Sequence, residues 1–197
     1  MKVFVTVNNY GGTEDNAGGE NKRGTGWYIL ADSAVSNTGK PFYLPDEYGK
    51  TVAYLCVAAK ISRLGKSVKK KFATRYYSEY APAVCFQLPE YAEKLRNSGL
   101  PEDPSRNFDK ALIVGDFIPK EEIGELEFWL NGESRSIFKV EELLKSTDEL
   151  LECISDINTL KMGDLVVPGL NGDIPLKEGD LIEIKKGRER MFHVRVK

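Results

Sequence analysis

Val52-Ala53-Tyr54-Leu55-Cys56-Val57-Ala58-Ala59-Lys60-Ile61 is an almost wholly apolar stretch with a single charged residue. A run of this length and composition predicts a β-strand that is buried on both faces. A strand buried in this way must be covered on both sides. The rest of the sequence must therefore supply the strands and helices that surround it.

Further strands are predicted on both sides of this stretch. Residues 2–7 place three valines, at 3, 5 and 7, on one side and Lys2, Phe4 and Thr6 on the other, which is typical of a strand. Asn131-Gly132 separates two apolar runs, and this dipeptide is the strongest short signal for a β-hairpin. The predicted strands cover residues 83–86, part of 110–118, 126–130, 134–138, 165–167, 181–184 and 192–196, and ordered chain is expected to resume at residues 27–30.

Two main helices are predicted, over residues 67–80 and 140–157. In the first, Val68, Phe72 and Tyr76 recur at a spacing of four residues and share one face. In the second, leucine and isoleucine recur at helical spacing. Strands outnumber helices, so the pattern indicates an α+β fold. Its 197 residues predict a single domain over 1–197.

Charge and cysteine content limit the class of protein. The chain has 28 Lys and Arg against 30 Asp and Glu, a net charge of −2, which does not favour a nucleic-acid or membrane-surface protein. Three cysteines without a CxxC pair predict neither a disulfide framework nor a zinc ribbon. No apolar stretch approaches the ~20 residues of a membrane span. We therefore expect a cytoplasmic protein that binds neither nucleic acid nor membrane.

The residues with chemical potential do not by themselves name a reaction. His193 is the only histidine and alternates with apolar neighbours, which predicts a solvent-exposed position shared with Arg195. Cys85 lies in an apolar run with no adjacent base, which predicts a buried thiol and no nucleophile. Residues 63–77 are rich in Lys and Arg; a solvated helix face is favoured over a site for an anionic partner.

A series of short segments recurs along nearly the whole chain: Asn8-Asn9-Tyr10, 32–34, 40–46, 63–66, 71–77, Phe108-Asp109, 114–117, 159–165 and 178–180. Taken in this order, they resemble the fumarylacetoacetate hydrolase family, and within it the acylpyruvate hydrolase and 2-keto-4-pentenoate hydratase-like subgroup. The resemblance implies a mixed β-roll with two main helices, and a homodimer or a heteromeric partner. It places the glycine-rich segment 11–26, which we expect to be mobile, at the family's lid position.

The family holds a divalent metal, usually magnesium, with three carboxylates, and the resemblance places these positions at Leu55, Val57 and Cys85. Leucine and valine offer magnesium no oxygen, and a thiol is too soft a ligand. We therefore expect the metal site to be lost and no cofactor to be bound. The resemblance assigns further pocket positions to Tyr10, Leu30, Arg106, Asp109, Gly169 and Leu170.

The resemblance leaves three functions open. The first is a catalytically inactive family protein that retains small-molecule or partner binding. The second is an active, metal-dependent hydrolase, isomerase or decarboxylase of 2-oxo acids with a displaced site and Mg²⁺ or Mn²⁺ as cofactor. The third is a structural or regulatory subunit. Polar groups for a displaced site could come from Asp32, Arg75, Glu79, Glu90, Arg106, Asp109 and Asp116.

Overall fold

A large mixed sheet forms the centre of the protein. The computed structural model describes residues 1–11 and 24–197, so most of the predicted loop over 11–26 lies outside the described residues. The strands of this sheet, in spatial order, are β2 (Gly26–Leu30), β1 (Val3–Val7), β10 (Leu165–Val167), β4 (Val52–Ile61), β5 (Tyr77–Gln87), β6 (Leu112–Val114) and β3 (Val35–Asn37). In addition, β11 (Asn171–Pro175) pairs with β4, and β7 (Ile118–Pro119) pairs with β5.

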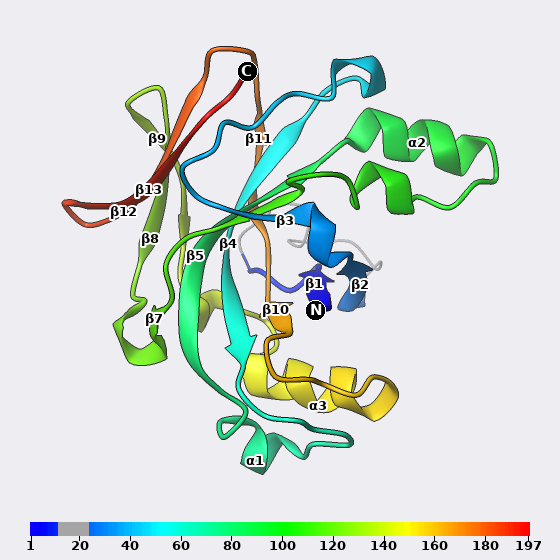
Figure 1. Ribbon diagram of the computed structural model, residues 1–197, viewed down its shortest axis with the longest axis vertical. Helices are drawn as coiled ribbons and strands as arrows, with labels where there is room; N and C mark the ends of the chain where they lie inside the picture. Colours follow the sequence, from blue (N-terminus) through cyan, green and yellow to red (C-terminus); the bar gives the residue numbers. More distant parts are fainter. Residues whose placement is uncertain (12–23) are drawn as a thin grey trace.

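A second, four-stranded antiparallel sheet packs beside the first, on the left in Figure 1. Its order is β13 (Glu189–Arg195), β12 (Leu181–Lys186), β8 (Leu126–Leu130) and β9 (Glu133–Phe138). The predicted hairpin between β8 and β9 is confirmed. Asn131 and Gly132 have φ values of 52° and 85°, the left-handed conformations that a tight hairpin turn requires.

The prediction for residues 52–61 is confirmed, because β4 has these bounds and is buried on both faces. Leu55 and Val57 lie in a core between the large sheet and the four-stranded sheet. Cys56 and Ala58 lie in a second core, formed where β1 and β2 curl over the opposite face. The architecture is a mixed β-roll of the α+β class, as the sequence predicts.

The helix predicted over residues 67–80 is wrong. Only Lys70–Ala73 forms a helix, the short α1, and the chain enters β5 at Tyr77. Tyr77 pairs with Ile61 and Tyr80 pairs with Ala59, so this segment continues the sheet beside β4. Sheet pairing and burial of aromatic side chains outweigh the helical spacing of the apolar residues.

The two longer helices are α2 (Pro89–Asn97) and α3 (Thr147–Ile157). α3 is shorter than the predicted 140–157 because Ser146 caps it, in a capping box with Glu149. α2 has no counterpart in the sequence prediction. Single 3-10 turns cover Asp32–Ala34, Asp46–Tyr48, Asp103–Ser105, Lys120–Glu122 and Val140–Glu142.

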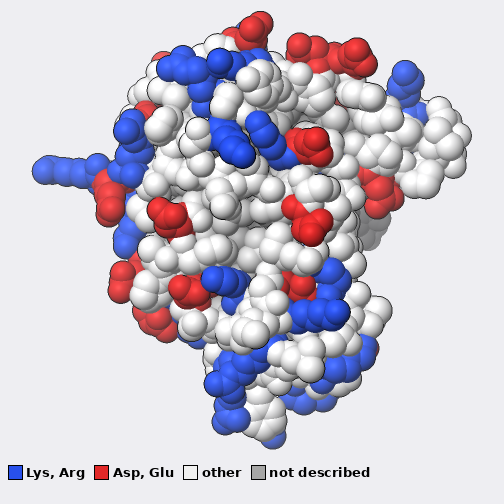
Figure 2. Space-filling model, in the orientation of Figure 1, with Lys and Arg blue, Asp and Glu red and all other residues white. Residues whose placement is uncertain are grey.

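Acidic and basic side chains are intermixed over most of the face in Figure 2, and basic side chains gather at its lower end, where α1 lies. Two of these lysines pair with α3: Lys69 with Glu152 at 3.3 Å and Lys70 with Glu149 at 2.9 Å. None of the helices described is long and apolar enough to span a bilayer.

Candidate functional site

Strand pairing determines which residues share a face with Cys85. In the antiparallel pair of β4 and β5, Tyr54 lies opposite Cys85, and Cys56 lies opposite Ala83. Directly opposed residues project to the same face of a sheet, and so do residues two apart in one strand. Tyr54, Cys56 and Cys85 therefore share one face.

The predicted grouping of Leu55, Val57 and Cys85 is wrong. Leu55 and Val57 project into the core against the four-stranded sheet, whereas Cys85 lies in the core on the other face. The physical reason is the two-residue period of a strand, because each residue on β4 faces away from its neighbours. If Cys85 marks the family's metal site, the β4 residues beside it are Tyr54 and Cys56.

Polar contacts connect Cys85 to Tyr28 on β2 and, through Tyr28, to Gln87 on β5. The Tyr28 hydroxyl lies 3.7 Å from the Cys85 sulfur. Gln87 donates a hydrogen bond from Nε2 to the same hydroxyl at 3.1 Å. The Arg106 guanidinium lies 5.3 Å from the centre of the Tyr28 ring, a cation–π contact. Tyr28, Tyr54, Cys56 and Cys85 are referred to below as the tyrosine–thiol cluster.

Burial keeps the tyrosine–thiol cluster uncharged at neutral pH. It raises the pKa of Cys85 to about 12, against the opposing effects of the Tyr28 hydrogen bond and the Arg106 charge. Burial is also the main cause that raises the pKa of Cys56 and of Tyr28. The pKa of Tyr54 is raised by burial first and then by the negative charge of Asp173. The cluster therefore offers neutral hydroxyls and thiols.

A hollow of about 260 Å³ opens beside the cluster, between the end of β5, α2 and the turn at Asp103–Ser105. Arg96 and Arg106 both reach Glu102: Arg96 Nε lies 2.8 Å from Oε1, and Arg106 Nη2 lies 3.0 Å from Oε2. Arg96 and Arg106 are offset by Glu102 and by Glu93, so the hollow has no net positive charge, but a guanidinium group can still form paired hydrogen bonds with a carboxylate. This α2 hollow is lined by Gln87, Leu88, Pro89, Ala92, Glu93, Arg96, Ser105 and Arg106.

The tyrosine–thiol cluster does not fit a magnesium or manganese ion. Tyr54, Cys56 and Cys85 provide one protonated phenol and two protonated thiols, whereas these cations prefer charged oxygen ligands. Over residues 1–11 and 24–197, no group of three or more His, Cys, Asp or Glu is arranged to hold a metal ion. Asp173 is the carboxylate whose charge acts on the cluster.

The other predicted pocket residues separate into distinct places. Leu30 is buried in the same core as Cys56 and Cys85, and Leu170 packs against that core. Arg106 lines the α2 hollow. Asp109 is exposed on the surface.

Tyr10 and Gly169 lie close to each other. The Tyr10 hydroxyl donates to Glu142 Oε2 at 2.7 Å and accepts from the Lys139 N–H at 2.8 Å. A Cβ at Gly169 would lie 2.7 Å from Leu143 and 3.7 Å from the Tyr10 side chain. Tyr10 therefore ties the N-terminal segment to the chain around residues 139–142, and Gly169 leaves room for the close approach of Leu143.

The polar groups considered for a displaced site make surface contacts. Glu79 lies 3.9 Å from Lys60, and Glu90 accepts a hydrogen bond from the Lys50 N–H at 3.3 Å. Asp32 lies 3.8 Å from the N-terminal ammonium. Arg75 stacks over Phe72, and Asp116 is exposed.

Sequence reasoning missed Tyr28, Tyr54, Gln87 and Arg96. A signal for Gln87 was present, because it follows Cys85 by two residues on one strand and therefore shares its face. Tyr28 lies far from Cys85 in the sequence, and the curled sheet brings its hydroxyl to 3.7 Å from the Cys85 sulfur. Arg96 lies on α2, which the sequence patterns do not predict, and lines the α2 hollow. The predictions for His193, exposed beside Arg195, and for Cys85 as a buried free thiol are confirmed.

Comparison with known proteins agrees with this fold. The chain is 27% identical to mouse "Oxaloacetate tautomerase FAHD1, mitochondrial" over 176 residues, which covers 86% of this chain and 79% of the relative. It is 24% identical to Dictyostelium discoideum "Oxaloacetate decarboxylase, mitochondrial" over 190 residues, with 92% and 87% covered. Fumarylpyruvate hydrolase from Pseudomonas aeruginosa, solved with Mn²⁺ and pyruvate, superposes with a TM-score of 0.88 at 20% identity and covers 100% of this chain and 89% of its own.

The fumarylpyruvate hydrolase structure contradicts our expectation that no cofactor is used. A protein with the same fold was solved with Mn²⁺, so the absence of carboxylates at the tyrosine–thiol cluster does not justify predicting a protein without a cofactor. The family model "Fumarylacetoacetate (FAA) hydrolase C-terminal" matches residues 2–190, nearly the whole chain. The protein therefore belongs to the fumarylacetoacetate hydrolase family.

Proposed function

We propose that this protein catalyses tautomerisation or decarboxylation of small 2-oxo dicarboxylic acids of the oxaloacetate type. The observation that carries the proposal is the continuity of the α2 hollow with the tyrosine–thiol cluster: Gln87 lines the hollow and donates to Tyr28. Relatives named oxaloacetate tautomerase and oxaloacetate decarboxylase support it.

Arg106 is the group that binds the substrate in this proposal. Its side chain lies at the wall of the hollow, about a third exposed, and its guanidinium can form paired hydrogen bonds with a carboxylate. The contact with the Tyr28 ring holds the guanidinium beside the cluster. A carboxylate on Arg106 would place the 2-oxo group of the same molecule near the tyrosine hydroxyls.

Tyr28 and Tyr54 supply hydrogen-bond donors for the reaction. Tautomerisation moves a proton from C3 to the 2-oxo oxygen; decarboxylation breaks a C–C bond, releases CO₂ and leaves the electron pair as an enolate. A neutral phenol can donate a hydrogen bond to the oxygen on which the charge develops. The raised pKa values of Tyr28 and Tyr54 keep these protons in place at neutral pH.

Asp173 is the proposed proton acceptor at C3. It is exposed, and its negative charge acts on Tyr54. A protein with the same fold was solved with Mn²⁺, although the residues described here include no group of three or more His, Cys, Asp or Glu arranged to hold a metal ion. For this reason the activity is assayed both with added cation and after chelation.

The test measures loss of the enol form and release of CO₂ from oxaloacetate, with chelator-treated protein and after addition of Mg²⁺ or Mn²⁺. We expect oxaloacetate to react faster with the protein than in a solution of the same cation without protein. Asp173→Asn should lower kcat by ~100-fold or more, as for loss of a general base. Arg106→Gln should raise KM by ~10-fold or more. Asp156→Asn, at the far end of α3, is the matched control and should leave both constants unchanged.

A second candidate is binding of the same acids without turnover. The replacement of charged oxygen ligands by phenol and thiols at Tyr54, Cys56 and Cys85 favours it. Isothermal titration with oxaloacetate separates the two functions. Binding that Arg106→Gln weakens, without catalysis in the presence of either cation, would favour the second candidate. If the protein neither binds oxaloacetate nor turns it over, both candidates are contradicted.

A further inference from the structure

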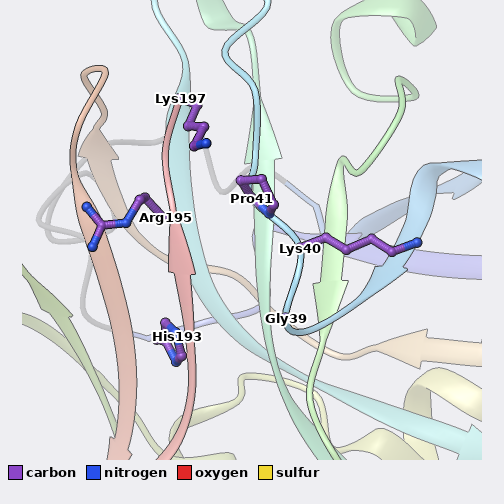
Figure 3. A pocket seen from close by; sticks show the side chains of 6 residues that line it. All are labelled: Gly39, Lys40, Pro41, His193, Arg195 and Lys197. Atoms are coloured by element: carbon purple, nitrogen blue, oxygen red, sulfur yellow. The ribbon is translucent and has the colours of Figure 1, made fainter.

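A second hollow lies away from the α2 hollow, between the segment Gly39–Pro41 and the outer face of β13 (Figure 3). Its volume is about 210 Å³. Six residues line it: Gly39, Lys40, Pro41, His193, Arg195 and Lys197. Neither the tyrosine–thiol cluster nor the proposed reaction uses any of them. We call it the β13 hollow.

The β13 hollow concentrates positive charge. His193, Arg195 and Lys197 alternate along the chain, so their side chains project to the same side. Lys40 adds a further ammonium from the opposite segment. Over the described part of the chain, none of these four side chains lies in an ion pair. The chain as a whole carries −2, so this excess is local.

The backbone beneath these side chains is held in place by hydrogen bonds. The Phe42 N–H donates to Arg195 O at 2.9 Å, and the Lys197 N–H donates to Phe42 O at 2.8 Å. Lys110 Nζ donates to Pro41 O at 2.7 Å, which brings another positive charge to this segment. Phe42 itself is buried and stacks on Phe86. The two segments that carry the basic groups are therefore fixed relative to each other.

Figure 3 shows how the basic side chains are placed around Pro41. Lys197 lies on one side and His193 on the other, while Lys40 and Arg195 extend outward in opposite directions. Lys40 and Arg195 are exposed and flexible, so both can turn inward over a bound anion. Pro41 provides an apolar surface between these basic groups. On the neighbouring strand β12, Glu183 lies opposite His193 and pairs with Lys185 and Arg190. This arrangement suits a compact anion with more than one negative charge.

We propose that the β13 hollow binds the phosphate group of a small molecule. Arg195 and Lys40 make charge-assisted hydrogen bonds to phosphate oxygens, and the His193 ring donates a further one. A phosphate satisfies this arrangement better than a carboxylate because it presents more oxygens and more charge. The basic groups surround one small hollow and do not form an extended stripe, which argues against a nucleic-acid strand. This inference is independent of the proposed enzyme activity.

The single histidine makes the test direct. Because His193 is the only histidine, its ring protons are identified in a proton NMR spectrum without assignment. The protein is titrated with inorganic phosphate and with pyrophosphate at fixed pH, against sodium chloride at matched ionic strength. We expect saturable shifts of the His193 resonances with both phosphates, a lower midpoint for pyrophosphate, and none with chloride.

Variants locate the binding at the hollow. Lys40→Gln and Arg195→Gln should each raise the midpoint by ~10-fold or more, the effect of losing one charge-assisted hydrogen bond. Lys94→Gln, an exposed lysine on α2, is the matched control and should leave the midpoint unchanged. All three positions are exposed, so the variants keep the fold, which thermal unfolding verifies. Any of three results would overturn the proposal. Chloride could cause the same shifts of the His193 resonances, Lys40→Gln and Arg195→Gln could leave the midpoint unchanged, or phosphate could cause no shift.

A phosphate group can belong to a free molecule or to a lipid. Sedimentation with phosphatidylcholine vesicles that contain phosphatidic acid separates these sources. Co-sedimentation that Lys40→Gln and Arg195→Gln abolish would assign the site to a lipid headgroup. Protein that stays in the supernatant, together with saturable NMR shifts, would assign it to a free phosphorylated molecule.

Discussion

At the residue scale, the alternation of side chains along β4 decides what surrounds Cys85. Leu55 and Val57 bury their side chains against the four-stranded sheet, and Tyr54 and Cys56 face Cys85. A shift of one position in a strand moves a side chain to the opposite face. To assign a family's metal ligands to residues of a strand, one must therefore know which face of the sheet each residue projects from, as well as which segment forms the strand.

This geometry predicts where a carboxylate metal site can be rebuilt. The triple variant Tyr54→Glu, Cys56→Glu, Cys85→Asp should bind Mg²⁺, because its three carboxylates share one face. Without metal the carboxylates repel each other, so the variant should be less stable than the natural protein. Mg²⁺ at 100 times its Kd should then raise the free energy of unfolding by ~2.7 kcal/mol. Calorimetry and thermal unfolding with Mg²⁺ or chelator measure both effects.

The control places the two glutamates one residue further along β4. Leu55→Glu, Val57→Glu, Cys85→Asp puts two charges into the apolar core, where each unpaired charge costs several kcal/mol. Since total stability is of the order of 5–15 kcal/mol, this variant should not fold. A folded control that binds Mg²⁺ would contradict the assignment of faces.

The buried thiols predict how stability depends on pH. Burial raises the pKa of Cys85 to about 12 and also raises that of Cys56. An unfolded thiol ionises near pH ~8.5, so above that pH the unfolded state loses protons that the native state keeps. The free energy of unfolding should therefore fall as pH rises, by up to ~1.4 kcal/mol per pH unit for each thiol.

Urea denaturation at a series of pH values above neutrality measures this fall. The double variant Cys56→Ala, Cys85→Ala is the control and should show a smaller slope, because its unfolded state lacks the two ionising thiols. Equal slopes for the variant and the natural protein would show that other groups cause the dependence.

At the scale of elements, residues 67–87 illustrate the limit of local patterns. Val68, Phe72 and Tyr76 have helical spacing, yet α1 spans only Lys70–Ala73 and β5 follows. The Tyr80 hydroxyl lies 2.6 Å from the Thr147 hydroxyl of α3, a contact that β5 makes possible. Long-range pairing with β4 decides the conformation of this segment.

α3 shows the opposite case, in which a local signal sets the boundary. The Ser146 side chain accepts a hydrogen bond from the Glu149 N–H, and Glu149 bonds back to the Ser146 N–H at 2.8 Å. Ser146→Ala removes the cap and should lower the free energy of unfolding by ~1 kcal/mol. Thermal unfolding followed by circular dichroism measures it. Ser134→Ala, on exposed β9, should change stability much less; an equal loss would argue against the cap.

At the scale of the whole molecule, the contact between the two sheets forms the main core. Phe128 on β8 is fully buried there. Phe128→Ala should lower the free energy of unfolding by ~3–5 kcal/mol through lost burial and the cavity that remains. Ile137→Ala, at a side chain 42% exposed on β9, should cost much less. Urea denaturation of both variants tests this, and similar costs would contradict the packing between the sheets.

The expectations of a homodimer or heteromeric partner, of no nucleic-acid or membrane partner, and of a cytoplasmic location stay predictions. Each concerns how the whole molecule meets its surroundings. The proposed phosphate site adds one such contact at the outer face of β13. The sedimentation experiment with phosphatidic acid vesicles also tests the expectation that the protein does not bind membranes.

Elements whose signals are local can be predicted directly from the chain. Continuous apolar residues predicted β4, Asn131-Gly132 predicted the β8–β9 hairpin, and the order of short motifs indicated the family. These features depend on neighbours a few residues apart, so they can be read directly from the chain.

Tertiary structure alone decided the site. The curl of the large sheet brings Tyr28 to Cys85, and α2 with the turn before Arg106 closes the hollow beside them. The register of β4 on β5 decides that Tyr54 and Cys56 face that hollow's side of the sheet. The physical reason is that strand pairing and curvature join residues distant in sequence through contacts that no local pattern encodes.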